Sequence, residues 1–304
     1  MVPAWPGWWD GRVEFAYVTR RPPERALWVE SIWYARGRID YRRERIAPTG
    51  STVGVVVLGD PIRLVAGDGS TFVADKGFLL GPHDRPVVNE PLGETHCVGV
   101  VTTPVGCGAV FGVAPAALRG RVADLLAAWP AAADLRRTLL RGGSAPEALD
   151  AYQRVLTTRG PTLAERRCAA AVAGLESDPM RPIAGLAAEL GVSHGHLDRE
   201  FTAVVGLSPR VLSRILRLRA LLAAIDVYGP VDWTGLAAAH GWFDQSHFIR
   251  DFRRHTGVTP SRYVAAQRTA FPPELAEPGF VPEMDVDVKS VQDGGRPGRA
   301  RSPA

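Results

Sequence analysis

The stretch GWFDQSHFIRDFRRHTGVTP, residues 241–260, brings aromatic and basic side chains close together in a short segment. Phe248 and Phe252 are four residues apart, with Arg250 between them and Arg253 directly after them. Because residues four apart lie on one face of a helix, both rings can be buried together. We therefore expect a helix whose aromatic side packs on its domain and whose basic side faces outwards.

The same arrangement occurs earlier in the chain, in LAAELGVSHGHLDREFTAVVGLSP, residues 186–209. The two stretches align at an offset of 50 residues up to Gly191 and Gly241, and at an offset of 51 beyond the following turn. One added turn residue that leaves both flanking registers intact indicates a duplicated helix-turn-helix unit. The positions aligned at the offset of 51 include His196/His247, Leu197/Phe248, Arg199/Arg250, Phe201/Phe252, Gly206/Gly257 and Pro209/Pro260.

Local signals predict two helices in each unit. An apolar stripe follows Pro182, Gly191 is expected to end the first helix, and Ser193 is expected to cap the second. In the second unit Asp244 takes the capping position, and we interpret Glu189 and Glu200 as ordinary surface charge. At about 100° per residue, the outward positions are Gly195, Asp198, Arg199 and Thr202 in the first unit, and Gln245, Ser246, Ile249, Arg250 and Arg253 in the second.

An outward face with amide and guanidinium groups has two interpretations. For a single helix it is a solvated face of an all-α domain. Gln and Arg are also the side chains that read adenine and guanine edges in the major groove, and the repetition favours that second interpretation. The segment between the units, residues 208–225, predicts a helix about 25 Å long. Such a rod could set two reading helices about one DNA turn, or roughly 34 Å, apart.

Residues 183–264 resemble the AraC/XylS family of transcription regulators. The first unit has the pattern S-x-x-x-L-x-R-x-F-x-x-x-x-G-x-S-P over 193–209, and the second has G-[aromatic]-x-D-x-S-x-F-x-R-x-F-x-x-x-x-G-x-T-P-x-x-Y over 241–263. The resemblance implies that the second helix of each unit enters the major groove. The implied DNA-facing residues are His194, Gly195, Asp198, Arg199 and Thr202, then Gln245, Ser246, Ile249, Arg250 and Arg253. We assign phosphate contacts to Ser193, Arg210, Arg214, Arg254 and Arg262.

The first unit departs from an ideal DNA reader at two positions. Gly195 has no side chain, and Asp198 places a negative charge near phosphates. Asp198 either accepts a hydrogen bond from cytosine N4, pairs with a nearby Arg, or indicates that this helix contributes little.

Residues 10–113 are rich in short apolar runs punctuated by turn residues, which predicts a small β-sandwich or barrel. This half more loosely resembles the cupin-like sensor domains found ahead of such DNA-binding units, and its effector is unidentified. Trp33, His83 and Arg85 are the candidate effector-pocket residues. His83 and His96 lack the metal-binding spacing of cupins, so we expect neither a metal nor a cofactor.

The fold class predicted is α+β with two domains, a cupin-like barrel with added helices and an all-α tandem helix-turn-helix domain. Helical spacing begins at Pro115, first in PAALRGRVADLLAAW, residues 115–129. The domain limits are 1–113 for the sensor, 114–178 for a helical connector or dimerisation region, 179–268 for the DNA-binding domain and 269–304 for a disordered tail. The two units are expected at 183–202 and 234–254.

Composition agrees with a DNA partner and excludes some other classes. The net charge is +4, and residues 180–268 alone contain eleven Arg against seven acidic residues. No apolar run is long enough to cross a bilayer, and the start of the chain lacks the pattern of a signal peptide. Three cysteines without metal-type spacing indicate a reducing compartment. We therefore expect a cytoplasmic protein without a membrane partner.

The leading hypothesis is a sequence-specific, non-enzymatic transcription regulator that binds double-stranded DNA. RNA polymerase, a small-molecule effector and a second copy of the chain are further expected partners. Two alternatives stay open: a cupin-like enzyme or DNA-repair protein that carries a DNA-binding unit, and a protein-interaction module with a decayed one.

Overall fold

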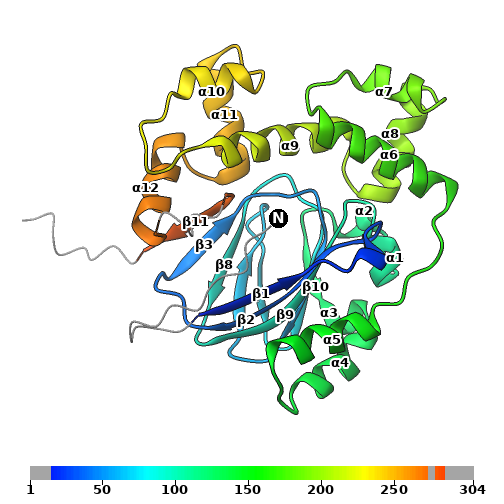
Figure 1. Cartoon of the computed structure of the whole chain (residues 1–304), viewed down its shortest axis with the longest axis vertical. Helices are drawn as coiled ribbons and strands as arrows, with labels where there is room; N and C mark the ends of the chain where they lie inside the picture. The colour runs from blue at the N-terminus through cyan, green and yellow to red at the C-terminus, as the bar shows by residue number, and fades with distance from the viewer. Residues whose placement is uncertain (1–14, 273–277, 285–304) are drawn as a thin grey trace, which may run out of the picture.

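The computed structural model describes residues 15–272 and 278–284. Figure 1 shows a barrel-like body of strands in the middle, with one group of helices across its top and a smaller group below it. The predicted α+β class with two domains is confirmed.

The β-rich body consists of two antiparallel sheets. The order in the first is β1-β2-β9-β4-β7-β10, and the order in the second is β11-β3-β8-β5-β6. The strands are β1 (Ala16–Arg20), β2 (Val29–Gly37), β3 (Arg43–Ile46), β4 (Val53–Val57), β5 (Ile62–Val65), β6 (Thr71–Ala74), β7 (Gly77–Leu80), β8 (Val87–Pro91), β9 (Thr95–Thr102), β10 (Val122–Asp124) and β11 (Phe280–Glu283).

The interior between these sheets is filled by apolar side chains. Val55 and Val57 of β4, Leu64 of β5 and Phe78 of β7 belong to one buried cluster there. Cys97, Cys107 and Cys168 are free and buried. Burial raises the pKa of the thiols of Cys97 and Cys168 to about 12. These thiols therefore act as small apolar core groups.

Short helices cover the outside of the first sheet. The hydroxyl of Tyr152 in α5 donates to the carbonyl of Gly54 at 3.1 Å, and Arg136 in α4 donates to the carbonyl of Val57 at 2.9 Å. This group consists of α1 (Cys107–Phe111), α2 (Pro115–Leu118), α3 (Leu125–Ala128), α4 (Ala131–Leu139) and α5 (Ala145–Val155), and a short 3₁₀ turn, η1 (Pro23–Arg25), lies between β1 and β2.

The prediction of one helical segment over residues 115–129 was wrong. The helix ends at Leu118, and Val122–Asp124 instead pair antiparallel with β7 as the edge strand β10. Helical spacing is a local signal, whereas the free edge of β7 offers hydrogen bonds that are visible only in three dimensions. The sheet therefore extends past the predicted sensor boundary at residue 113.

The helices across the top of Figure 1 form two similar groups joined by α9. Each group has a long helix, then a short helix, a turn and a third helix. Their bounds are α6 (Leu163–Ser177), α7 (Ile183–Glu189) and α8 (His194–Val205), then α9 (Pro209–Ala224), α10 (Trp233–Ala239) and α11 (Gln245–Thr256), followed by α12 (Pro260–Ala270).

The two units are attached to the β-body in different ways. Leu197 and Phe201 of the first unit, with Leu212 of α9, belong to a buried cluster that continues into the first sheet and its helices. Phe248 and Phe252 of the second unit belong to a separate cluster. The first unit therefore shares its core with the sensor domain, while most of the second unit's core is its own.

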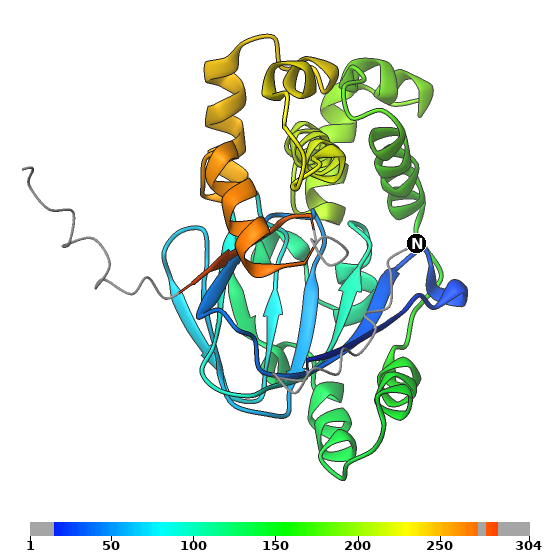
Figure 2. The same ribbon diagram turned by 60° about the vertical axis from the view of Figure 1, so that its left-hand side comes forward.

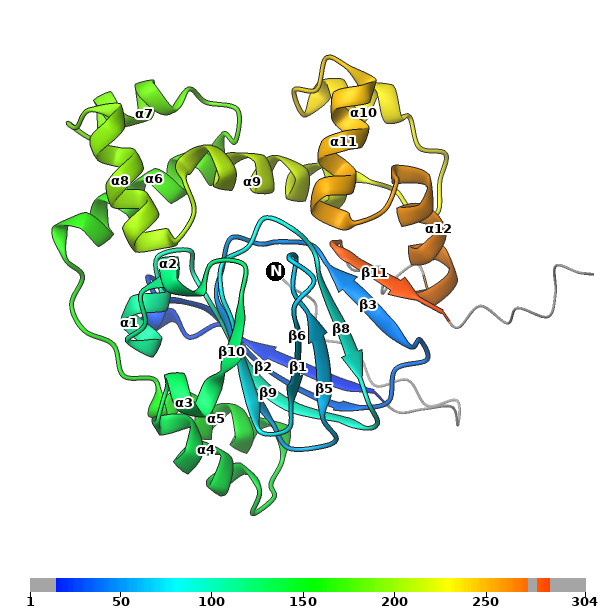
Figure 3. The ribbon, with the colours of Figure 1, turned by 180° about the vertical axis from the view of Figure 1, so that it is seen from behind.

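A strand after α12 ties the second unit to the sensor domain. Figures 2 and 3 show β11 running beside β3, with α12 packed against it. Val281 is buried in the core of the second unit, and Glu283 forms ion pairs with Arg43 and Arg45 of β3. The prediction of a disordered tail over 269–304 was therefore wrong for residues 280–283, because the partner of this strand is more than 200 residues away in sequence. Residues 273–277 and 285–304 of that predicted tail lie outside the described residues.

The loop between β7 and β8, residues 81–86, contacts the ends of both α8 and α11. Gly206 and Gly257 follow these helices in the left-handed conformation, with φ of 79° and 78°. A Cβ on Gly206 would lie 2.7 Å from Pro82, and one on Gly257 would lie 3.3 Å from Pro86. Glycine is thus required at these positions both by the backbone and by the close approach of the loop.

Polar contacts complete this junction. The guanidinium of Arg254 donates to the carboxylate of Asp84 at 2.6 Å, and Nδ1 of His255 donates to the Asp84 carbonyl at 2.8 Å. Nδ1 of His83 donates to the Gly81 carbonyl at 2.9 Å. Nε2 of both histidines is buried without a partner. Burial lowers the pKa of each ring, so both are neutral at pH 7.

Acidification should destabilise the contact between the 81–86 loop and α11 at a higher pH than that at which carboxylates become protonated. A neutral buried His gains a proton on unfolding, with an ordinary pKa of about 6.5, so stability falls as the pH drops below that value. We expect the melting temperature to decrease between about pH 7 and pH 5.5. Burial also lowers the pKa of His96 and His240, so His255→Gln should reduce this pH dependence but not abolish it. An identical pH profile for His255→Gln, measured by differential scanning calorimetry, would contradict the role of this ring.

The core of the second unit should depend strongly on Phe252. Its fully buried ring lies 5.7 Å from those of Phe248 and Tyr263 in edge-on contacts. Phe252→Ala should lower the free energy of unfolding by about 3–5 kcal/mol, measured by urea unfolding followed by circular dichroism. Phe243, in the turn before α11, is 96% exposed and is the matched control. Phe243→Ala should change stability by less than about 0.5 kcal/mol.

Candidate nucleic-acid interface

In the first unit, α7 and α8 are held at a fixed angle by a short turn and a cap. Pro182 precedes α7, and the side chain of Ser193 accepts a hydrogen bond from the backbone N–H of His196 at 3.2 Å. Leu197 and Phe201, both fully buried, hold α8 on the domain. The N-terminus of α8 therefore faces away from the β-body, because its other end contacts the 81–86 loop.

The second unit repeats this construction with different residues. Asp232 caps α10, and the carboxylate of Asp244 caps α11 by accepting from the N–H of Ser246 at 2.9 Å. Phe248 packs edge-on against Trp242 at 5.6 Å and against Phe252 at 5.7 Å. The turn between α10 and α11 contains five residues against four in the first unit, in agreement with the insertion inferred from the repeat.

Most of the predicted DNA-facing residues are exposed. In α8 these are His194, Gly195 and Arg199, and in α11 they are Gln245, Ser246, Arg250 and Arg253. Asp198 and Thr202 are half-buried, and so is Ile249, which packs against the core of the second unit. Within residues 15–272 and 278–284, no ion pair involves Arg199, Arg250 or Arg253. The outer faces of both helices thus carry unpaired positive charge.

The predicted phosphate-contact residues lie around these faces in different settings. Ser193 caps α8, Arg210 is exposed at the start of α9, and Arg262 is exposed in the first turn of α12. Arg214 is half-buried. Arg254 forms an ion pair with Asp84 of the sensor domain. Its guanidinium must leave this carboxylate before it can contact a DNA phosphate.

A carboxylate that is at least half-buried fixes each recognition helix to the long helix that precedes it. Glu200 in α8 accepts two hydrogen bonds from Arg167 in α6, both at 2.7 Å, and lies 3.4 Å from Nε2 of His196. Glu200 was therefore wrongly interpreted as ordinary surface charge. Because a half-buried ion pair with good geometry is worth more than an exposed one, it helps to orient α8.

The second unit has the same cluster at equivalent positions. Asp251 in α11 lies 3.3 Å from Arg217 in α9 and 3.2 Å from His247, and it accepts from the indole N–H of Trp242 at 3.1 Å. The guanidinium of Arg217 also stacks on Trp242, 3.9 Å from the ring centroid. Burial lowers the pKa of Arg217 despite the nearby carboxylate. Arg217 is thus a structural cation rather than a surface one.

These clusters were missed in the sequence, although a signal was present. Glu200 and Asp251 align at the offset of 51 residues, like the two histidines, and Arg167 and Arg217 align at the offset of 50. An acid repeated at the same place on a buried helix side indicates a partner on the preceding helix.

The candidate effector residues come from two different parts of the β-body, β2 and the 81–86 loop. Trp33 in β2 stacks on Tyr17 at 6.1 Å, His83 is buried in the 81–86 loop, and Arg85 is exposed in the same loop beside Gly67.

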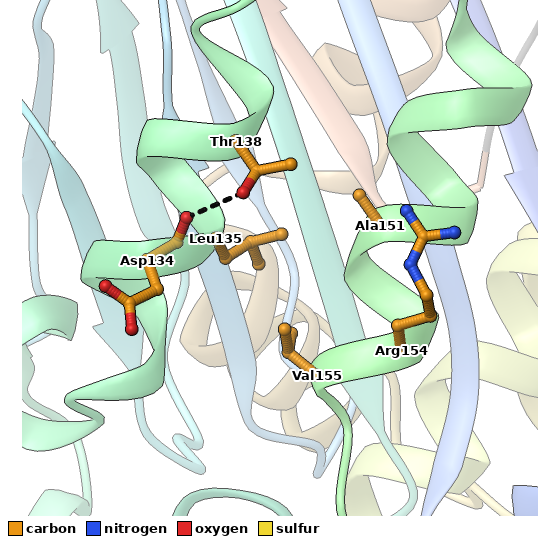
Figure 4. Close-up of a pocket in the computed structure, with 6 residues that line it drawn as sticks. All are labelled: Asp134, Leu135, Thr138, Ala151, Arg154 and Val155. Carbon is orange, nitrogen blue, oxygen red and sulfur yellow. Dashed lines mark hydrogen bonds between the residues drawn. The ribbon is translucent and has the colours of Figure 1, made fainter.

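Two pockets occur elsewhere on the sensor domain. One, of about 120 Å³, lies between α4 and α5 (Figure 4). The other, of about 360 Å³, lies beside β8 and includes Arg38, Tyr41 and Glu90. Neither is lined by Trp33, His83 or Arg85.

In the part of the chain that the structure describes, no three His, Cys, Asp or Glu side chains come together as a metal site. No helix in the same part has both the length and the apolar composition needed to cross a membrane.

Comparison with known proteins gives matches for the helical region and for the larger part of the chain. Residues 186–266 match the family model described as a helix-turn-helix domain. No curated protein matches the chain. A structure of ToxT from Vibrio cholerae is 13% identical, with 82% of this chain and 97% of that one covered and a TM-score of 0.43. A probable AraC family transcriptional regulator from Rhodopseudomonas palustris is 28% identical over 35% of this chain and 99% of its own, with a TM-score of 0.31.

The match over 186–266 coincides with the two helix pairs, their buried aromatic sides and their exposed basic sides. Residues 186–266 are therefore a helix-turn-helix domain, the kind of module by which transcription regulators bind DNA.

Proposed function

We propose that the chain is a sequence-specific transcription regulator whose helices α8 and α11 enter successive major grooves on one side of a DNA duplex. One observation carries this proposal: each helix buries its apolar side and exposes an opposite side rich in groups that hydrogen-bond to base edges. Arg199, Arg250 and Arg253 suit guanine, and Gln245 suits adenine.

The linker and the charge distribution support the same geometry. Helix α9 has 16 residues and is about 24 Å long, which suits two reading helices placed about one turn of DNA apart. The exposed arginines at α9 and α12, Arg210 and Arg262, would neutralise phosphates and make binding depend on salt. In this proposal Gly195 and Asp198 leave the first unit with fewer base contacts than the second.

The sensor domain would supply regulation. The 81–86 loop carries His83 and Arg85 and contacts both recognition helices, so an effector that moves this loop would act on both units together. Trp33 is the third residue that we assign to the effector response. The chain would act through binding alone, not as an enzyme, with RNA polymerase as its target on DNA and a second copy as a further partner.

The direct test begins with the selection of bound sequences from random duplexes by the full chain. A working regulator should enrich one motif with two half-sites about one helical turn apart, roughly 10 base pairs. Enrichment of no motif would overturn the proposal.

Arg250 should contribute to base recognition. We expect Arg250→Ala to cost about 1–3 kcal/mol of specific binding and to relax the preference at one base position, measured by fluorescence anisotropy on the selected duplex. Arg141→Ala, an exposed arginine at the end of α4, is the matched control. Unchanged affinity and preference for Arg250→Ala would contradict this role.

Arg262 should behave differently, as a phosphate contact. Arg262→Ala should weaken binding to all sequences by a similar factor and reduce the slope of log affinity against log salt by about 1. A titration series from low to moderate salt measures this slope. A loss restricted to one base position would instead assign Arg262 to base recognition.

A further inference from the structure

Phe243 is exposed to an unusual degree for an aromatic side chain. It is 96% exposed, whereas Leu163, the next most exposed large apolar side chain in the described residues, is 71% exposed. The aromatic rings nearest to it in the sequence, Trp242, Phe248 and Phe252, are buried. The ring of Phe243 therefore contributes almost nothing to the core.

The first unit shows what an apolar residue at this place ordinarily does. Val192 directly precedes the cap Ser193 and packs against the cluster that contains Leu197, four residues after the cap. Such a pair fixes the entry of the chain into the helix.

In the second unit the inserted residue changes this arrangement. Phe243 directly precedes the cap Asp244, but Trp242 occupies the buried place against Phe248 instead. Because of the insertion, Phe243 does not pack against the core and its ring is exposed to solvent.

The surroundings of Phe243 are those of the predicted DNA-reading end. Gln245 and Ser246, both exposed, follow within three residues, and α11 begins at Gln245. The sensor domain contacts the other end of α11, at Gly257. The immediate neighbours Asp244, Gln245 and Ser246 are polar, unlike the apolar centre of a protein-binding patch.

Base edges in the major groove include one apolar group, the C5-methyl of thymine, and Phe is among the side chains that contact it. We propose that Phe243 is a specificity-determining residue that packs against a thymine methyl group in the half-site bound by α11. This inference rests on the proposed function and adds an apolar contact to the hydrogen bonds of Gln245 and Arg250.

The test removes the methyl group and the ring separately and together. On the selected duplex, each thymine of that half-site is replaced by deoxyuridine, which lacks only the methyl. One replacement should weaken wild-type binding about fourfold, as expected for loss of one buried methyl-sized group. Phe243→Ala should weaken binding to the thymine duplex at least as much and should show no further loss with deoxyuridine.

Three controls separate the outcomes. Phe243→Leu, which keeps an apolar side chain, should retain part of the methyl dependence. Leu140→Ala, which changes an exposed apolar residue at the C-terminal end of α4 in the sensor domain, should behave as wild type. Arg250→Ala should weaken binding to both duplexes and keep the methyl dependence.

The inference is overturned if Phe243→Ala binds the thymine duplex like wild type, or if deoxyuridine weakens this variant as much as wild type. It is also overturned if no replacement affects the wild-type chain, or if Phe243→Ala binds normally but loses transcription, which would assign the ring to a protein partner. In each case a retained effect of Arg250→Ala leaves the proposed function intact. If neither Phe243→Ala nor Arg250→Ala changes binding, the proposed function itself is contradicted.

Discussion

Burial of two side chains four residues apart, once in each recognition helix, is the constraint on which the rest of the structure depends. Leu197 with Phe201, and Phe248 with Phe252, fix the rotation of α8 and α11 about their own axes. With that rotation fixed, the opposite side of each helix must face outwards, and the sequence on that side is free to serve recognition. The half-buried Glu200 and the buried Asp251 add a directional contact, because each is held by an arginine from a different helix.

The same constraint links recognition to the sensor domain. Each recognition helix ends in a glycine that touches one loop of the β-body, residues 81–86, from two sides. The two units are otherwise separated by α9, and their cores are distinct. Under the proposed function, a displacement of this single loop would reach both helices at the ends opposite those proposed to read DNA, without passing through either core.

The sequence predicted features that repeat or have a local period. The offset of 50 and 51 residues identified both units, their caps and the inserted turn residue. Three features depended on contacts distant in sequence and were not predictable in this way. Val122–Asp124 is a strand only because β7 lies beside it, and Phe280–Glu283 is a strand only because β3 does. Glutamate is ordinarily a surface residue, and only the position of Arg167 shows that Glu200 forms a half-buried ion pair.

The strand β11 also protects an edge of the sheet. β3 pairs with β8 on one side and with β11 on the other, so both rows of its backbone groups have partners. If the chain is cut after α12, β3 loses that neighbour and presents unpaired N–H and C=O groups to solvent. Such an edge readily pairs with another chain and promotes aggregation. An isolated sensor fragment would therefore associate through a surface that the intact protein does not offer, and a dimer of that fragment would say nothing about the assembly of the whole chain.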